Sequence, residues 1–268
     1  MIKLAVSNPL NFKPILLKSS GALRVLYFII SGLVVYGNQS IRAQTIPIDH
    51  KLFDEVLAKF VDTLGRVDYA GLKKNPSNLN RYLELLSANP PASNWPREDQ
   101  LAYWINVYNA FTLSLVVKHY PVESIKNIRP GIPFINSVWD IRFIKIGNET
   151  FDLNNIEHRI LRKQFEEPRI HFAINCASFS CPRLLNEAYT GKKLESQLTK
   201  AARFFLSDTT KNIITVNYLS LSKIFDWFGG DFKKKGSLID FLNLYAPLKI
   251  SDKANINYLE YRWTLNKQ

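Results

Sequence analysis

The 268-residue chain contains only two cysteines, Cys176 and Cys181, so its stability must come mainly from packing and not from a network of disulfides. It has no internal repeat and no low-complexity tract. Phosphate-cradling glycine loops, calcium loops and dinucleotide fingerprints are also absent, and no cofactor is expected. Repeat architectures and the common nucleotide-binding classes are therefore excluded.

Acidic residues are missing from the first 43 positions, which carry five basic residues. A cationic stretch to Arg24 is followed by the apolar run 25–36 and a short polar tail that ends at Ala43. The apolar run is about 12 residues, well short of the roughly 20 that a membrane-spanning helix needs. We predict a signal peptide over residues 1–43, export to the periplasm or the extracellular space, and membrane contact only through an uncleaved leader.

The formal charge of +12 comes from 35 basic and 23 acidic residues, and five of the basic residues belong to the leader. The remaining Lys and Arg are interleaved with acids along the chain, a distribution that does not favour a nucleic-acid partner. The run 233–235 of three lysines is typical of a solvated loop. An unknown ligand or an envelope protein is the expected partner, and the sequence does not indicate an oligomeric state.

Periodicity of apolar residues predicts helices over 52–64, 77–86, 101–118, 152–161, 194–205 and 238–245. Strands are expected within 138–153, where Gly147 and Asn148 offer a hairpin turn, and over 169–175, 212–216 and 259–265. Pro182 suits the first position of a further helix, with Cys181 as its cap. We predict one compact α+β domain over residues 44–268, with several helices packed on a small, mostly antiparallel sheet.

Four segments, residues 102–110, 156–162, 171–182 and 223–228, form a recognisable set. Together they resemble the family called domain of unknown function 547, over about residues 55–245. The resemblance implies no settled activity. Bacterial members of this family often look secreted, and this chain, which lacks a coiled-coil extension, resembles the simple exported bacterial form.

The candidate site centres on Cys176 and Cys181, with His171 and His158 as partners. In an oxidising compartment the two cysteines form a structural disulfide. Alternatively, Cys181 at a helix start becomes a thiolate nucleophile, with Cys176 in reserve and either histidine as base. In a third interpretation the two thiols and two imidazoles bind zinc, although their spacing matches no standard zinc pattern.

Further polar residues are candidates for the site's binding surface. In the catalytic interpretation Asn175, Asn109 or Glu157 orients the imidazole. Asn106 and Asn109 lie beside Trp104 on a helix that is apolar on nearly every side, where they either bond neighbouring backbone or line a pocket with His171.

Two local patterns each leave two interpretations open. Glu157 and His158 are adjacent, and on an α-helix neighbouring side chains diverge, so we expect only one of them to face a site. The aromatic turn 227–230 either closes over a ligand or belongs to the core.

Two functions remain open on the sequence. One is hydrolysis or acyl transfer at a Cys/His site, and the other is a non-catalytic envelope module that binds a peptide, glycan or protein while Cys176 and Cys181 form a structural bridge.

Overall fold

The computed structural model describes residues 46–129 and 137–268, and the predicted signal peptide lies outside them. The described chain is a compact mixture of helices and short strands, which confirms the α+β prediction. Its α-helices are α1 (Lys51–Phe60), α2 (Tyr69–Lys74), α3 (Ser77–Ala88), α4 (Arg97–His119), α5 (Arg162–Phe165), α6 (Leu194–Ser207), α7 (Ile224–Trp227), α8 (Gly229–Phe232) and α9 (Leu238–Asn243). Its strands are β1 (Ile144–Ile146), β2 (Glu149–Phe151), β3 (Ile213–Ile214), β4 (Tyr218–Leu221) and β5 (Asn255–Tyr258).

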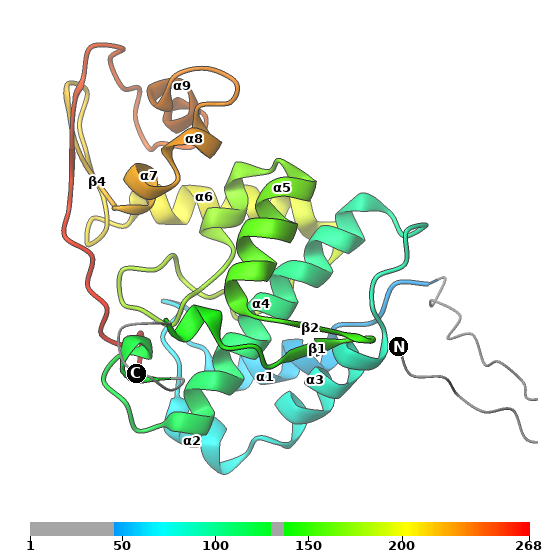
Figure 1. Cartoon of the computed structure of the whole chain (residues 1–268). Coiled ribbons are helices and arrows are strands. Elements are labelled where there is room, and N and C mark those ends of the chain that lie inside the picture. The colour runs from blue at the N-terminus through cyan, green and yellow to red at the C-terminus, as the bar shows by residue number, and fades with distance from the viewer. Residues whose placement is uncertain (1–45, 130–136) are drawn as a thin grey trace, which may run out of the picture. The chain divides into compact units, whose positions relative to one another are not determined.

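Helix α4 runs through the middle of the molecule and packs against α2, α3 and the segment before α5 (Figure 1). Its first turn carries Glu98 and Asp99, and its last carries Lys118 and His119, so the charges oppose the helix dipole at both ends. Nearly every side chain between Leu101 and Val117 is buried, as expected for a helix that is apolar on all sides. Within residues 46–129 and 137–268, no helix combines the length and apolar character that crossing a membrane requires.

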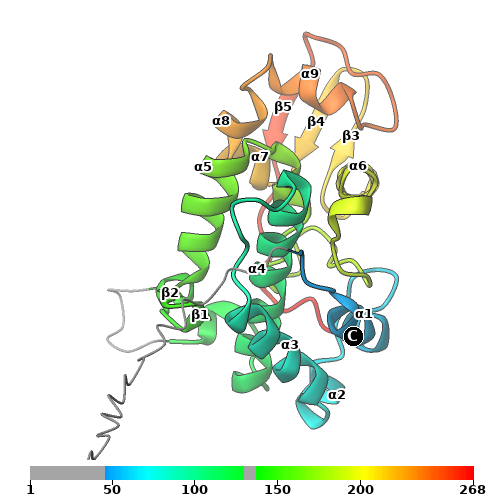
Figure 2. The same ribbon diagram turned by 90° about the vertical axis from the view of Figure 1, so that its right-hand side faces the viewer.

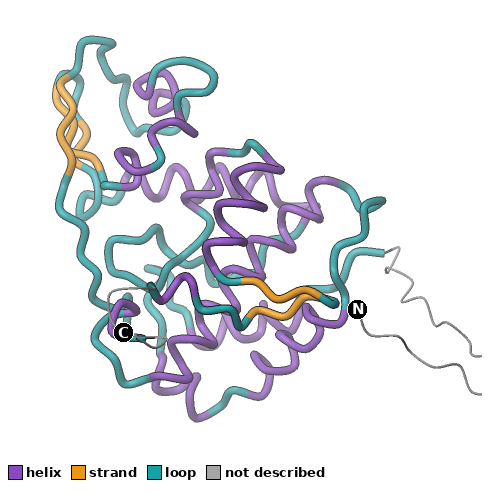
Figure 3. The backbone as a smooth tube through the Cα atoms, viewed as in Figure 1, coloured by secondary structure: helices purple, strands orange, loops and turns teal. Residues whose placement is uncertain are grey.

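The strands form two separate small sheets (Figure 3). The antiparallel hairpin β1–β2 turns at Gly147, which has a φ of +58°, a conformation that glycine adopts without strain. In the second sheet β4 is central, antiparallel to β3 and parallel to β5. The hairpin was anticipated from the sequence, whereas the parallel pair was not.

Buried apolar side chains form two clusters. The larger one surrounds α4, and the smaller one lies between α6, α7–α9 and the sheet β3–β4–β5 at the other end of the domain (Figure 2). The short segment Pro168–Phe172 joins them, because Ile170 belongs to the larger cluster and Phe172 to the smaller one.

The strand predicted over 169–175 is wrong, because Pro168–Phe172 forms a 3₁₀-helix. Pro168 occupies its first turn, and the Glu167 carboxylate accepts a hydrogen bond from the backbone N–H of Arg169. The apolar alternation that suggested a strand arises because this segment is covered by both clusters, so successive apolar residues are buried on different sides.

Two further predictions fail nearby. No helix starts at Pro182, and residues 182–190 are irregular, so Cys181 caps nothing. Residues 259–265 alternate in exposure as predicted, but they make only isolated bridges, Ser124 to Thr264 and Ser178 to Leu265, instead of a regular ladder.

Candidate functional site

A cavity of about 180 Å³ has lining residues from both hydrophobic clusters, among them Tyr108 from the larger and Ile224 from the smaller. Its polar lining residues are Asn154, Glu157, His158 and His171. One wall is the pair Cys176 and Cys181 with Pro182. Most of the rest is aromatic and comes from Tyr108, Trp139, Trp227, Phe228, Tyr261 and Trp263.

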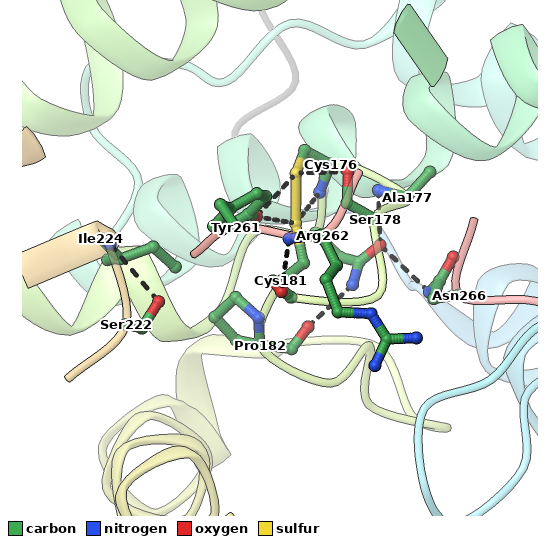
Figure 4. The surroundings of a disulfide bond; sticks show 12 residues. Cys176, Ala177, Ser178, Cys181, Pro182, Ser222, Ile224, Tyr261, Arg262 and Asn266 are labelled. Carbon is green, nitrogen blue, oxygen red and sulfur yellow. Dashed lines mark hydrogen bonds between the residues drawn. A yellow bond between two sulfur atoms is a disulfide. The ribbon is translucent and has the colours of Figure 1, made fainter. Parts of the chain in front are cut away.

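Cys176 and Cys181 form a disulfide, and the described residues contain no free cysteine (Figure 4). The Tyr261 hydroxyl lies 3.1 Å from the Cys181 sulfur, and the backbone N–H of Cys176 lies at the same distance from that sulfur. Backbone hydrogen bonds tie the loop between the cysteines to the C-terminal segment, from Phe179 N to Thr264 O at 2.7 Å and from Ser180 N to Arg262 O at 3.2 Å. The disulfide loop is thus a fixed wall of the cavity.

His171 lies almost fully buried, with its Nε2 2.8 Å from Asp231 Oδ2 and its ring stacked 4.1 Å from that of Phe228. Asp231 also accepts a 2.5 Å hydrogen bond from Arg162 Nε. Burial lowers the pKa of His171, and the neighbouring carboxylate only partly opposes this. The imidazole is therefore neutral at physiological pH, and Nε2 carries its proton because a carboxylate oxygen accepts there.

His158 is half-buried, and its Nδ1 lies 3.1 Å from Arg162 Nη1. A guanidinium only donates, so Nδ1 accepts and the proton resides on Nε2. Burial, helped by the charge of Arg162, lowers the pKa of His158. A neutral N–H donor is the chemistry that this side chain offers.

Glu157 is a buried carboxyl group that lines the cavity, and Tyr108 Oη, 3.4 Å from its Oε2, is its one hydrogen-bond partner in the described part of the chain. Burial raises the pKa of Glu157 to about 7, although the charge of Arg162 opposes the shift. Near neutral pH this carboxyl exchanges between its neutral and charged forms. A cavity residue with such a shift is a candidate for function.

Glu157 and His158 both face the cavity, so the expectation that only one of them would do so is wrong. They lie in a π-helix, Asn155–Leu161, that continues into α5. A π-helix closes i→i+5 hydrogen bonds in a wider turn, which lets neighbouring side chains diverge less than on an α-helix. Such turns occur frequently at functional sites.

Asn106, Asn109 and Asn175 bond backbone and do not line this cavity. Asn106 donates to Tyr189 O at 2.7 Å and accepts from Tyr189 N at 3.0 Å. Asn109 donates to Ala173 O at 2.9 Å and accepts from Asn175 N at 2.8 Å. These buried amides are satisfied on both sides and fix α4 to Tyr189 and to the segment that leads into the disulfide loop.

The contacts of Asn175 and Trp104, two other residues of the predicted site, support the fold and do not form part of the cavity wall. Asn175 accepts from Ala177 N at 2.8 Å and donates to Pro182 O at 2.7 Å, so it braces the disulfide loop from within. Trp104 packs its ring against Phe151 at 5.8 Å, away from the cavity.

The structure does not support Cys181 or Cys176 as a thiolate nucleophile. Both sulfurs are bonded, Cys181 does not start a helix, and neither imidazole makes a hydrogen bond to sulfur in the described residues. In residues 46–129 and 137–268 no three His, Cys, Asp or Glu side chains are grouped to hold a metal ion. His158, His171, Cys176 and Cys181 do share one cavity, as the catalytic hypothesis required.

Sequence reasoning missed Asp231, Arg162 and most of the aromatic wall. Tyr261 and Trp263 alternate along the C-terminal segment, and that alternation was assigned to a strand face. Trp227 was noted as part of an aromatic turn, and its side chain, 47% exposed, is the most accessible aromatic ring of the wall.

The fold and site define a mixed α and β domain with an aromatic cavity closed by a disulfide loop. Residues 92–206 match the family model described as protein of unknown function, DUF547. The match confirms the resemblance over a shorter stretch than residues 55–245. No curated protein and no solved structure matches the chain.

Proposed function

We propose that this protein is a non-catalytic, exported binding domain that takes a small ligand, or one group of a larger envelope ligand, into the aromatic cavity. Cys176 and Cys181 serve it as a structural bridge. The family assignment carries no activity, so the proposal depends on the site alone.

The observation that carries the proposal is the convergence of six aromatic side chains and one buried carboxyl on a single cavity. Binding sites are commonly concave and mostly apolar, with a few placed polar groups that orient the ligand. Glu157 is such a group, since Tyr108 is its one hydrogen-bond partner among the described residues. A folded protein has little reason to bury a weakly bonded carboxyl beside a cavity unless a ligand completes its contacts.

Hydrolysis or acyl transfer by cysteine is less well supported, because it would first require reduction of the disulfide. In the oxidising compartments to which we expect export, such a bond persists. In the binding proposal the two sulfurs remain in the disulfide that the structure shows.

A small-molecule screen by NMR tests the binding proposal. With tryptophan side chains labelled, ligands should shift the indole signals of Trp227, Trp139 and Trp263, and Trp227→Ala should weaken binding at least tenfold. Tyr218→Ala, which removes a similarly exposed ring outside the cavity, should leave binding unchanged. The proposal fails if no compound in a library of saccharides, amines and peptides shifts these signals.

Thiol chemistry separates the binding domain from the cysteine enzyme. We expect native protein to contain no thiol that reacts with iodoacetamide, and alkylation conditions should not affect ligand binding. One fast-reacting cysteine would favour the enzyme instead.

Export has its own test. Cell fractionation should recover the protein outside the cytoplasm, and mass spectrometry of the mature chain should find Gln44 at its start. Recovery with residues 1–43 attached would contradict the cleavage.

A further inference from the structure

We infer that the group bound in this cavity is an organic cation, a methylated ammonium head. The inference rests on the proposed function, and it names the class of ligand that the cavity walls favour.

The aromatic wall of the cavity favours a cation. The Trp227, Tyr261 and Trp263 rings are in mutual contact, with centroids 4.9 Å apart for Trp227 and Tyr261 and 4.5 Å apart for Tyr261 and Trp263. Trp139 extends the group, 5.4 Å from Trp263. Several electron-rich ring faces around one volume attract a cation through the ring quadrupoles, and this is how quaternary ammonium groups are recognised.

The surroundings of the wall already hold cations in this way. Lys126 Nζ lies 4.8 Å from the centroid of Trp263. The Arg162 guanidinium lies 5.0 Å from the centroid of Phe228, another lining residue. Two of the lining rings thus bind positive charge within the protein itself.

The charge balance around Glu157 also favours a cation. Of the charged groups that face it, Arg162 forms an ion pair with Asp231, so their charges offset each other. His158 and His171 are neutral, because burial lowers the pKa of each. Burial raises the pKa of the Tyr108 hydroxyl, which stays protonated. Glu157 is thus the one carboxylate among the residues that line the cavity, and no salt bridge in the described part of the chain pairs it with a cation of its own.

The cavity offers few hydrogen-bonding groups to a ligand. A saccharide unit carries several hydroxyls, and each hydroxyl that is buried needs a partner. Apart from the hydroxyl and indole N–H groups of the aromatic wall, the polar groups that line the cavity are few: Asn154, Glu157, His158 and His171, whose Nε2 is already bonded to Asp231. A methylated ammonium needs few or no hydrogen bonds, and it gains from ring faces and one anion.

A cation that binds to the ionised carboxylate of Glu157 competes with the proton of this carboxyl group. Because the pKa of Glu157 is about 7, the charged fraction rises about tenfold between pH 6 and pH 8, and the affinity for the cation should rise by the same factor. A neutral ligand of the same shape should show no such rise.

Choline and 3,3-dimethyl-1-butanol, its uncharged isostere, provide the test. In isothermal titration calorimetry of the intact protein at pH 8, choline should bind at least tenfold more tightly than the alcohol. The affinity for choline should fall about tenfold at pH 6. Glu157→Gln should reduce the preference for choline to the part that the aromatic rings supply and should abolish the pH dependence, whereas Glu149→Gln, at an exposed position outside the cavity, should change neither.

The results separate the two proposals. Equal binding of choline and the alcohol, or no binding of either, overturns the inference of a cation. In that case the binding function still stands if another compound class shifts the indole signals in the NMR screen. A pH dependence that persists in Glu157→Gln overturns the role of this carboxyl, and thermal unfolding of each variant shows that it is folded.

Discussion

Replacing Glu157 by glutamine should stabilise the protein at alkaline pH and have almost no effect at acid pH. Gln has nearly the same shape and can still accept the hydrogen bond from Tyr108, which lies 3.4 Å from Oε2. The substitution removes only the capacity to ionise in a buried place. Its effect on stability therefore measures what burial of this charge costs.

The sign follows from the pKa of the folded state. Burial raises the pKa of Glu157 from 4.5 to about 7, so the folded protein holds this proton more tightly than the unfolded chain does. The favourable contribution of the protonated carboxyl is complete below about pH 4, declines as the unfolded chain ionises, and is gone above pH 7. A shift of this size corresponds to about 3 kcal/mol.

Urea denaturation at pH 4, 5, 6, 7 and 8 gives the free energy of unfolding of each protein. The advantage of Glu157→Gln over the parent should grow by about 3 kcal/mol from pH 4 to pH 8, equivalent to roughly 6–12 °C in the unfolding temperature. Glu149→Gln, whose side chain is exposed, is the matched control and should show no pH-dependent difference. A constant difference between Glu157→Gln and the parent across this range would refute the argument.

Three further perturbations have expected outcomes. Replacing both Cys176 and Cys181 by serine should lower the free energy of unfolding by about 2 kcal/mol, the chain-entropy value for so short a loop, and urea denaturation under non-reducing conditions measures it. Asn109→Ala leaves the buried N–H of Asn175 and a carbonyl unpaired and should cost about 2–4 kcal/mol in the same assay, so a loss below 1 kcal/mol would contradict the bracing role. Although burial opposes it, hydrogen bonds from neighbouring donors hold the pKa of Asp231 well below its usual range, so the stabilising effect of its carboxylate is present above about pH 4 and is lost as the pH falls below that. Asp231→Asn should therefore be about 2 kcal/mol less stable than the parent at pH 7 and should lose less stability than the parent on acidification. Thermal unfolding at pH 7 and pH 3 measures both differences.

The helices around the core could be predicted because their signal is local. Apolar residues at helical spacing identified α1, α3, α4 and α6, and the charged ends of α4 are visible in the sequence. The hairpin β1–β2 followed from its turn residues. In each case the residues that decide the structure are neighbours in the chain.

The site was predicted only in part because its geometry is set by distant contacts. Apolar alternation around Ile170 fits a strand, but two clusters on opposite sides can produce the same pattern in a 3₁₀-helix. The π-helix that turns Glu157 and His158 toward one cavity has no recognisable local signature. Asp231, the partner of His171, lies 60 residues further along the chain.

The cavity draws on stretches of the chain that are far apart. The family match spans residues 92–206, yet Ile224, Trp227, Phe228, Tyr261 and Trp263 contribute to the lining from beyond it. During synthesis the pocket is therefore completed only when the last aromatic residues have left the ribosome. A fragment trimmed to the matched stretch would retain Glu157 and both cysteines but lose much of the surface that would hold a guest.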